Sequence, residues 1–141
     1  MHDCSEEIKG AFLKVTPARV AALQLFESHD TPLDSQYVVG RLVKEGVDRV
    51  TVFRILNTFV DKGLLRKLEF QEGKARYELL NRGDHHHFVC STCGDIIDIG
   101  EDHIMHEYLE KMEKKYGFMV TEHTLLYRGI CQVCQKKGRA N

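Results

Sequence analysis

Four of the five cysteines in this 141-residue chain form two Cys-x-x-Cys pairs, Cys90 with Cys93 and Cys131 with Cys134. Each Cys-x-x-Cys turn directs two thiolates at one point, so two such turns supply the four ligands of a tetrahedral zinc or iron site. The 37 residues between the pairs (94–130) are more than an ordinary zinc ribbon contains, so the metal would join the ends of a whole subdomain. The sequence therefore predicts a structural tetrathiolate zinc site, with two disulfides or a redox-active pair as the alternatives.

Composition helps to separate these alternatives. The chain has no apolar stretch long enough to cross a membrane and no basic-then-apolar leader, which predicts a cytoplasmic protein without a membrane partner. Disulfides are rare in that compartment, and paired cysteines are there more often metal ligands. Cys4 is unpaired and close to the terminus, and we expect it to have no role.

Three consecutive histidines, His85, His86 and His87, stand before the first cysteine pair. On a strand, alternate residues point to opposite faces, so His85 and His87 share one side while His86 faces the other. Glu78 and Asp98 are candidate carboxylate partners for the first face, and such a ligand set suits Fe²⁺, Mn²⁺ or Zn²⁺. Two histidines and a carboxylate also describe a non-haem iron enzyme, which is the alternative function.

The first half of the chain has a helical pattern. Thr16 precedes Pro17, which predicts a helix start, and Asp34 is placed to cap a second helix. A third helix is predicted over 51–61, and it ends at Gly63, which can adopt the left-handed cap conformation. Two short strand-like runs follow around the turn 71–74, which is typical of a β-hairpin.

Helices followed by a β-hairpin predict a winged helix-turn-helix domain. We therefore expect an α+β protein with a winged-helix DNA-binding domain over 1–80, a hinge over 81–84, and a small α/β metal-binding domain over 85–141. In that second domain the patterns predict strands at 88–90 and 96–99, a helix at 101–116 and one or two strands within 118–130. The helix repeats apolar side chains every four residues, which predicts an inner face; these side chains are Ile104, Tyr108, Met112 and Tyr116.

Positive charge gathers on the third helix and the segment after it. The chain as a whole carries a net charge of −1, yet 49–67 contains five basic residues and one acidic residue. The second helix of a helix-turn-helix enters the major groove, so Thr51, Phe53 and Arg54 are candidates for contacts with bases. Arg49 is a candidate for phosphate contacts. A solvated basic face is the alternative, and the adjoining hairpin and metal-binding segment favour DNA.

The chain resembles the ferric uptake regulator family of metal-dependent bacterial repressors over nearly its whole length. The resemblance lies in the two cysteine pairs with their preceding histidines and in short motifs shared with the family: Leu13-Lys14-Val15-Thr16 with Arg19, Val50-Thr51-Val52-Phe53-Arg54-Ile55-Leu56, Gly63-Leu64-Leu65, Tyr77-Glu78-Leu79 and Gly129-Ile130-Cys131. It implies a winged helix followed by a dimerisation domain, and a homodimer that binds a pseudo-palindromic operator in double-stranded DNA. The function implied is repression of metal-uptake or peroxide-stress genes, rather than an enzyme activity.

The resemblance also implies roles for single residues. Lys14 would approach the minor groove of the DNA, and Arg19 and Arg54 would contact the DNA backbone or bases. Phe53 stands where the family usually has tyrosine. The regulatory metal would bind the following four residues: Glu78, His85, His87 and Asp98. The family adds a histidine where this chain has Thr31 and Pro32, and His29 is the nearest substitute. A further site is implied around His86 and His123, and its helix ligand falls on Met105, beside His103, His106 and Glu107.

Overall fold

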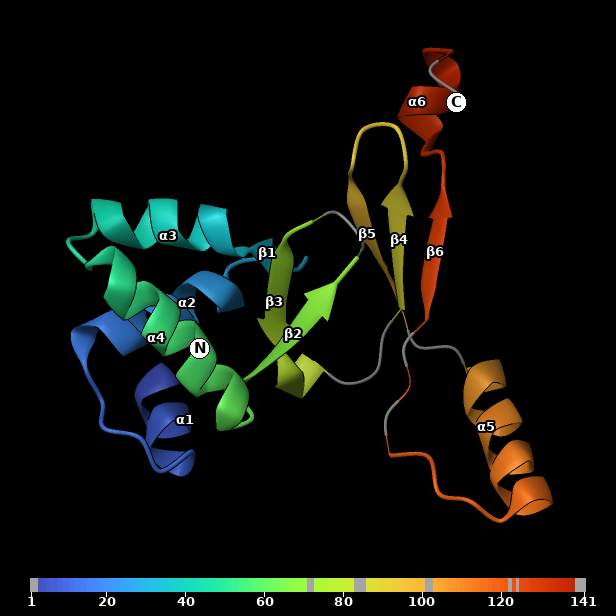
Figure 1. Cartoon of the computed structure of the whole chain (residues 1–141), viewed down its shortest axis with the longest axis horizontal. Coiled ribbons are helices and arrows are strands. Elements are labelled where there is room, and N and C mark those ends of the chain that lie inside the picture. The colour runs from blue at the N-terminus through green and yellow to red at the C-terminus, as the bar shows by residue number, and fades with distance from the viewer. Residues whose placement is uncertain are drawn as a thin grey trace. The chain divides into compact units, whose positions relative to one another are not determined.

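The computed structural model describes residues 3–70, 73–82, 86–100, 103–121, 123 and 125–138, which form an α+β structure as expected. The chain divides into two compact units, Met1–Gly83 (unit 1) and Asp84–Asn141 (unit 2), and each is considered by itself (Figure 1). Within the described residues, no helix is both long and apolar enough to cross a membrane.

Unit 1 begins with four helices, α1 (Cys4–Gly10), α2 (Pro17–Glu27), α3 (Ser35–Lys44) and α4 (Arg49–Asp61). Each starts after a residue whose side chain accepts a hydrogen bond from a backbone N–H of the first turn. These capping residues are Asp3, Thr16, Asp34 and Asp48. The caps predicted at Thr16 and Asp34 are therefore confirmed, because a cap satisfies a donor that the helix itself leaves unpaired.

The end of α4 leads directly into the wing, the hairpin of β2 (Leu65–Glu69) and β3 (Ala75–Leu79). Gly63 has a φ of 77°, as predicted, and this left-handed residue lets Leu64 N–H donate to the Phe59 carbonyl at 2.8 Å. A short strand, β1 (Leu33–Asp34), completes an antiparallel sheet of order β1-β3-β2 (Figure 1). The predicted winged-helix arrangement is confirmed.

The helices and the wing of unit 1 enclose one apolar core. Phe59 of α4, Leu23 of α2 and Val38 of α3 are fully buried in it. Cys4 also packs into this core, which corrects the expectation of a residue without a role. Its thiol donates to a carboxylate oxygen of Glu27 at 3.4 Å.

Unit 2 contains a three-stranded sheet of order β5-β4-β6. Its strands are β4 (His86–Cys90), β5 (Ile96–Ile99) and β6 (Leu126–Gly129), and β4 pairs antiparallel with β5 and parallel with β6. Helix α5 (His103–Tyr116) lies between β5 and β6 in the chain, and a short α6 (Gln132–Lys136) follows β6. The described residues of 118–130 thus contain one short strand, in agreement with the prediction of one or two, and α6 was not predicted.

Two of the apolar side chains predicted on the inner face of α5 are exposed in the single chain. Tyr108 and Tyr116 are 58% and 60% exposed. The four-residue repeat correctly predicted a helix and an apolar face. It was wrong about burial, because the spacing says nothing about whether another surface of the same chain covers that face.

Candidate functional site

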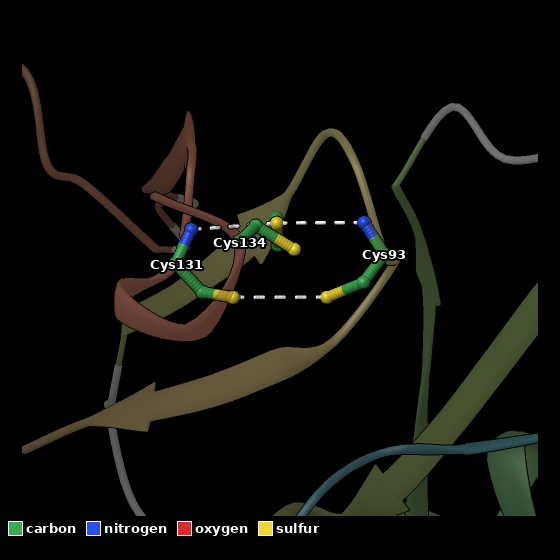
Figure 2. Close-up of side chains that lie close together, drawn as sticks. Cys93, Cys131 and Cys134 are labelled. Carbon is green, nitrogen blue, oxygen red and sulfur yellow. Dashed lines mark hydrogen bonds between the residues drawn. The ribbon is translucent and has the colours of Figure 1, made fainter. Parts of the chain in front are cut away.

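The cysteine cluster, Cys90, Cys93, Cys131 and Cys134, comes together at one end of the sheet of unit 2. The four sulfur atoms all lie within 4.8 Å of one another, and the Sγ atoms of Cys93 and Cys131 are 3.8 Å apart (Figure 2). Tetrahedral zinc with Zn–S bonds of about 2.3 Å places its sulfurs about 3.8 Å apart. All four are free thiols, so the arrangement fits a structural zinc ion rather than two disulfides.

Backbone turns hold this geometry. Cys90 ends β4, and Gly94 N–H returns to the Cys90 carbonyl at 2.9 Å with a φ of 80°, so the first pair sits in a tight loop. Cys131 is the N-cap residue of α6, and Cys134 lies within that helix. Gly129 pairs with Cys90 across β6 and β4, and a Cβ there would lie 3.0 Å from the Phe88 ring. The two pairs are therefore joined by parallel strand pairing that requires a small residue.

The cluster is already arranged to stabilise a thiolate. Backbone N–H groups of Cys131 and Cys93 donate to Cys90 Sγ at 3.4 and 3.5 Å, and these hydrogen bonds, chiefly that from Cys131, lower the pKa of Cys90 to about 6. Burial, and after it the Cys131 thiol, raises the pKa of Cys134. Four adjacent thiolates need a cation, so a zinc ion would displace the remaining protons and offset two of the four negative charges.

Two of the predicted regulatory ligands meet across neighbouring strands. His87 of β4 stands opposite Asp98 of β5 in the antiparallel register, and His87 Nε2 is 3.4 Å from Asp98 Oδ1. The His87 residue is 4% exposed. A buried imidazole beside a carboxylate supplies two of the ligand types that Fe²⁺, Mn²⁺ and Zn²⁺ accept. His85 lies outside the described residues.

Glu78, the third described member of that set, belongs to unit 1. It lies on β3 of the wing and is 2% exposed, and its Oε1 is 3.1 Å from a guanidinium nitrogen of Arg66, its register partner on β2. A buried carboxylate needs such a partner. In the sequence Arg66 stands out only as one of the five basic residues of 49–67, because its place across the hairpin from Glu78 depends on the register of β2 and β3.

The histidines considered for a further site have neighbours of their own. The ring centroid of His123 is 6.0 Å from that of His86 on β4 and 6.5 Å from that of His106 on α5. His86 and His87 thus have different partners, as expected for consecutive residues of a strand. His103 is the first residue of α5, and its side chain lies outside the described residues.

His29, the suggested substitute for the family histidine, is engaged locally. Its Nδ1 lies 2.9 Å from the Leu25 carbonyl oxygen and its Nε2 lies 3.0 Å from the Tyr37 hydroxyl, which also accepts a hydrogen bond from Arg41. Both ring nitrogens therefore have partners within unit 1. To bind a metal, His29 would have to give up one of these hydrogen bonds.

The residues predicted to contact DNA are divided between two segments of unit 1. Lys14 is exposed before α2, and its carbonyl accepts a hydrogen bond of 2.7 Å from the Arg19 guanidinium. Arg49 and Arg54 are exposed on α4, and the Arg49 guanidinium carbon lies 5.6 Å from the centre of the Phe53 ring.

Thr51 is half-buried on the same helix, where its N–H and hydroxyl both donate to the Asp48 carboxylate. Sequence reasoning did not single out Val50, which is 55% exposed in the first turn of α4. Its exposure could have been predicted from the helical period, because Val50 follows Arg49 and lies on the side of the helix away from Val52 and Ile55.

Comparison with known proteins agrees with this geometry. The model of the ferric uptake regulator family matches residues 11–128. The ferric uptake regulation protein of Neisseria meningitidis serogroup A is 36% identical over 137 residues, covering 94% of each chain.

Two solved structures are similar over most of the chain. The ferric uptake regulator of Vibrio cholerae is 29% identical, with a TM-score of 0.77, over 92% of this chain and 100% of its own. The regulator of Pseudomonas aeruginosa solved with manganese is 28% identical, with a TM-score of 0.78, over 93% of this chain and 99% of its own.

Fold and site thus define a winged-helix protein with a cysteine cluster suited to zinc, of the class of metal-dependent transcription regulators rather than enzymes. The chain belongs to the ferric uptake regulator family.

Proposed function

We propose that this chain is a metal-responsive repressor of metal-uptake or peroxide-stress genes, which binds a pseudo-palindromic operator in double-stranded DNA as a homodimer. Residues 1–80 would form the winged-helix DNA-binding domain, 81–84 the hinge and 85–141 the metal-binding dimerisation domain. A transcription regulator acts where the bacterial chromosome lies, so we place the protein in the cytoplasm.

The regulatory metal is Fe²⁺, Mn²⁺ or Zn²⁺ in this proposal, held by Glu78, His85, His87 and Asp98. The observation that carries it is the pair of His87 and Asp98, which brings a buried imidazole and a carboxylate to 3.4 Å on adjacent strands of unit 2. A buried histidine next to a carboxylate is a common arrangement for metal ligands. The manganese in the related P. aeruginosa structure supports a divalent cation as the signal.

The ligand set crosses the boundary between the two domains, and this provides the switch. Glu78 belongs to the wing, whereas His87 and Asp98 belong to unit 2. An ion bound by all of them would fix the orientation of the winged helix in each subunit. Without the ion, DNA would have to select one orientation among several, and the apparent affinity would fall by the fraction that is competent. Because Glu78 pairs with Arg66, its carboxylate must serve both cations or exchange one for the other.

A further metal site in the dimerisation domain would use His86 and His123, with His103 or His106 supplied by α5. The ring separations support His106, since the His123 ring lies 6.0 Å from the His86 ring and 6.5 Å from the His106 ring. An ion there would attach α5 to the sheet. Its role would be to stabilise the domain, so its loss should weaken DNA binding less than loss of the regulatory ion.

The homodimer is supported by apolar side chains that a single chain leaves exposed in unit 2. They occur on β5, β6 and α5, and include Ile97, Ile99, Tyr108, Tyr116 and Tyr127. Exposed apolar groups gathered in one small domain are typical of a protein–protein interface. A twofold dimer also matches a pseudo-palindromic operator, because each subunit would present one α4 to one half-site.

His87→Ala tests the bridging mechanism, with His86→Ala as the matched control from the opposite face of β4. We expect His87→Ala to keep one structural zinc per chain and the dimer, yet to lose at least about tenfold in metal-stimulated DNA affinity. His86→Ala should have a milder effect. DNA affinity would be measured by fluorescence anisotropy at increasing Mn²⁺, with zinc content from elemental analysis.

The pH dependence gives a second measurement on the same variants. Protons compete with the metal for the imidazole nitrogens, so the metal response of the wild type should weaken below about pH 6. Full metal-dependent binding by His87→Ala would overturn the bridging mechanism. Failure to bind any promoter fragment from its own genome with Fe²⁺, Mn²⁺ or Zn²⁺ would overturn the proposed function.

A further inference from the structure

The solvent-facing side of α4 carries an apolar residue in the middle of its positive charges. Arg49, Val50, Arg54 and Asn57 are exposed, whereas Val52, Ile55, Leu56 and Phe59 point into the core. At 100° per residue, Val50 lies almost opposite the centre of the buried face. Val50 is 55% exposed, and it is the central apolar group of the side that would enter a DNA groove.

Phe53 is less available than its position in the sequence suggests. The ring is half-buried, packs partly against the core of unit 1, and has the Arg49 guanidinium carbon 5.6 Å from its centre. A guanidinium over an aromatic face is held by cation–π attraction. Phe53 therefore serves first as a platform that positions Arg49, and Val50 is the apolar side chain left to contact a ligand.

An isolated exposed valine has no meaning by itself, but the charges around Val50 indicate the ligand. Arg49 and Arg54 flank it, within a stretch (49–67) of five basic residues and one acidic residue. That charge is complementary to phosphate and would bring the first turns of α4 to the base edges. In the major groove the apolar feature is the 5-methyl group of thymine, which small aliphatic side chains contact.

We propose that Val50 is a specificity-determining residue that contacts the 5-methyl group of a thymine in each operator half-site. The assignment rests on the proposed function, and it adds a base preference at one position. Arg49 and Arg54 would position α4, and Val50 would favour thymine over cytosine, because cytosine offers no methyl group at that place.

A double-mutant cycle with uracil tests this contact, since replacing thymine by uracil removes only the methyl group. The probe is a duplex enriched by in vitro selection with the zinc-loaded wild-type protein and Mn²⁺. Each thymine of one half-site is replaced by deoxyuridine in turn, and affinities are measured for wild type, Val50→Ala and Val43→Ala. Val43 is a matched control, because it is 46% exposed on α3 instead of α4.

For the wild type, we expect uracil at one position to lower the affinity about fourfold, the effect of exposing one methyl-sized group. Val50→Ala should bind the thymine duplex about fourfold more weakly and lose its sensitivity to uracil at that position, while Val43→Ala keeps it. Uracil sensitivity that is equal in wild type and Val50→Ala would overturn the assignment and leave the proposed function standing. A selection that enriches no sequence would overturn the proposed function, and the assignment with it.

Discussion

The two units of this chain are stabilised in different ways. Unit 1 buries a continuous apolar core of helices and wing, in which Phe59, Leu23 and Val52 are fully covered. In unit 2, the buried cluster consists of Cys90, Cys131 and Cys134, with the partly buried Phe88 and Ile130 packed against it. The stability of unit 1 can therefore come from the hydrophobic effect, whereas the buried cluster of unit 2 consists of cysteines instead of apolar side chains.

This difference agrees with the general behaviour of small domains. A unit of fewer than about 60 residues buries little apolar surface, and metal ions or oligomerisation commonly make up the deficit. Unit 2 has features suited to both: the convergent thiols and the exposed side chains such as Tyr108 and Tyr127. We infer that unit 2 is stable only with its zinc and its partner subunit, whereas unit 1 is stable without them.

Removing the zinc should have the largest effect on this comparison. Cys93→Ser takes away one of the four ligands, and because metal binding to such a cluster contributes directly to folding, unit 2 should lose its structure. Unit 1 should keep its own cooperative unfolding transition. Hydrogen exchange with mass spectrometry would measure both: protection lost in 86–138 and retained in α2 and α4.

Cys4→Ser is the control for the zinc experiment, because it also removes a thiol but lies in unit 1. It should retain about one zinc per chain. If Cys93→Ser loses its zinc and unit 2 remains protected, the sheet is self-sufficient and the contrast between the units is wrong. Two stable disulfides in freshly isolated protein would contradict the zinc site itself.

A cavity in unit 1 should produce a smaller effect, in the other half of the chain. Phe59 is completely buried, so Phe59→Ala should lower the free energy of unfolding of unit 1 by about 3–5 kcal/mol. Zinc content and hydrogen-exchange protection around Cys90 should not change. Urea unfolding followed by helical circular dichroism would measure the change. Loss of zinc in this variant would mean that the two units fold as one.

The contrast also explains why the sequence predicted unit 1 better than unit 2. In unit 1, the caps at Thr16 and Asp34, the stop at Gly63 and the hairpin are local signals, and the structure confirms them. In unit 2, α6 was not predicted, and the sequence left one or two strands open within 118–130. The described residues there form one strand, β6, which is defined by its parallel pairing with β4, far away in the sequence. Tertiary pairing of this kind leaves little trace in a local pattern.

The candidate site shows the same division. The spacing of the cysteines predicted the convergence of their sulfurs, because a Cys-x-x-Cys turn is itself a local geometry. The engagement of His29 with Leu25 and Tyr37 was not predictable, since it depends on how α2 and α3 pack. The exposure of Val50 was available in principle from helical periodicity.

The smallest expected effect concerns a strained residue at the edge of unit 1. Phe12 is 94% exposed and has a φ of 60°, the left-handed conformation that disfavours side chains. It ends the turn after α1, where its N–H donates to the Lys9 carbonyl and the Leu13 N–H donates to the Ile8 carbonyl. This is the closing pattern in which glycine is usually found, and a side chain there costs about 1–2 kcal/mol.

Phe12→Gly should therefore raise the free energy of unfolding of unit 1 by about 1 kcal/mol, since the relief of strain exceeds the entropy that glycine adds to the unfolded chain. The measurement is the midpoint of urea unfolding of unit 1 in the zinc-loaded protein. Phe59→Ala should shift this midpoint in the opposite direction. Phe12→Ala separates strain from exposure, because alanine removes the exposed ring and keeps the Cβ. If alanine stabilises unit 1 as much as glycine, the exposed ring rather than the backbone carries the cost. If neither does, the turn tolerates Phe12 without strain, and unit 1 is less sensitive at its edge than in its core.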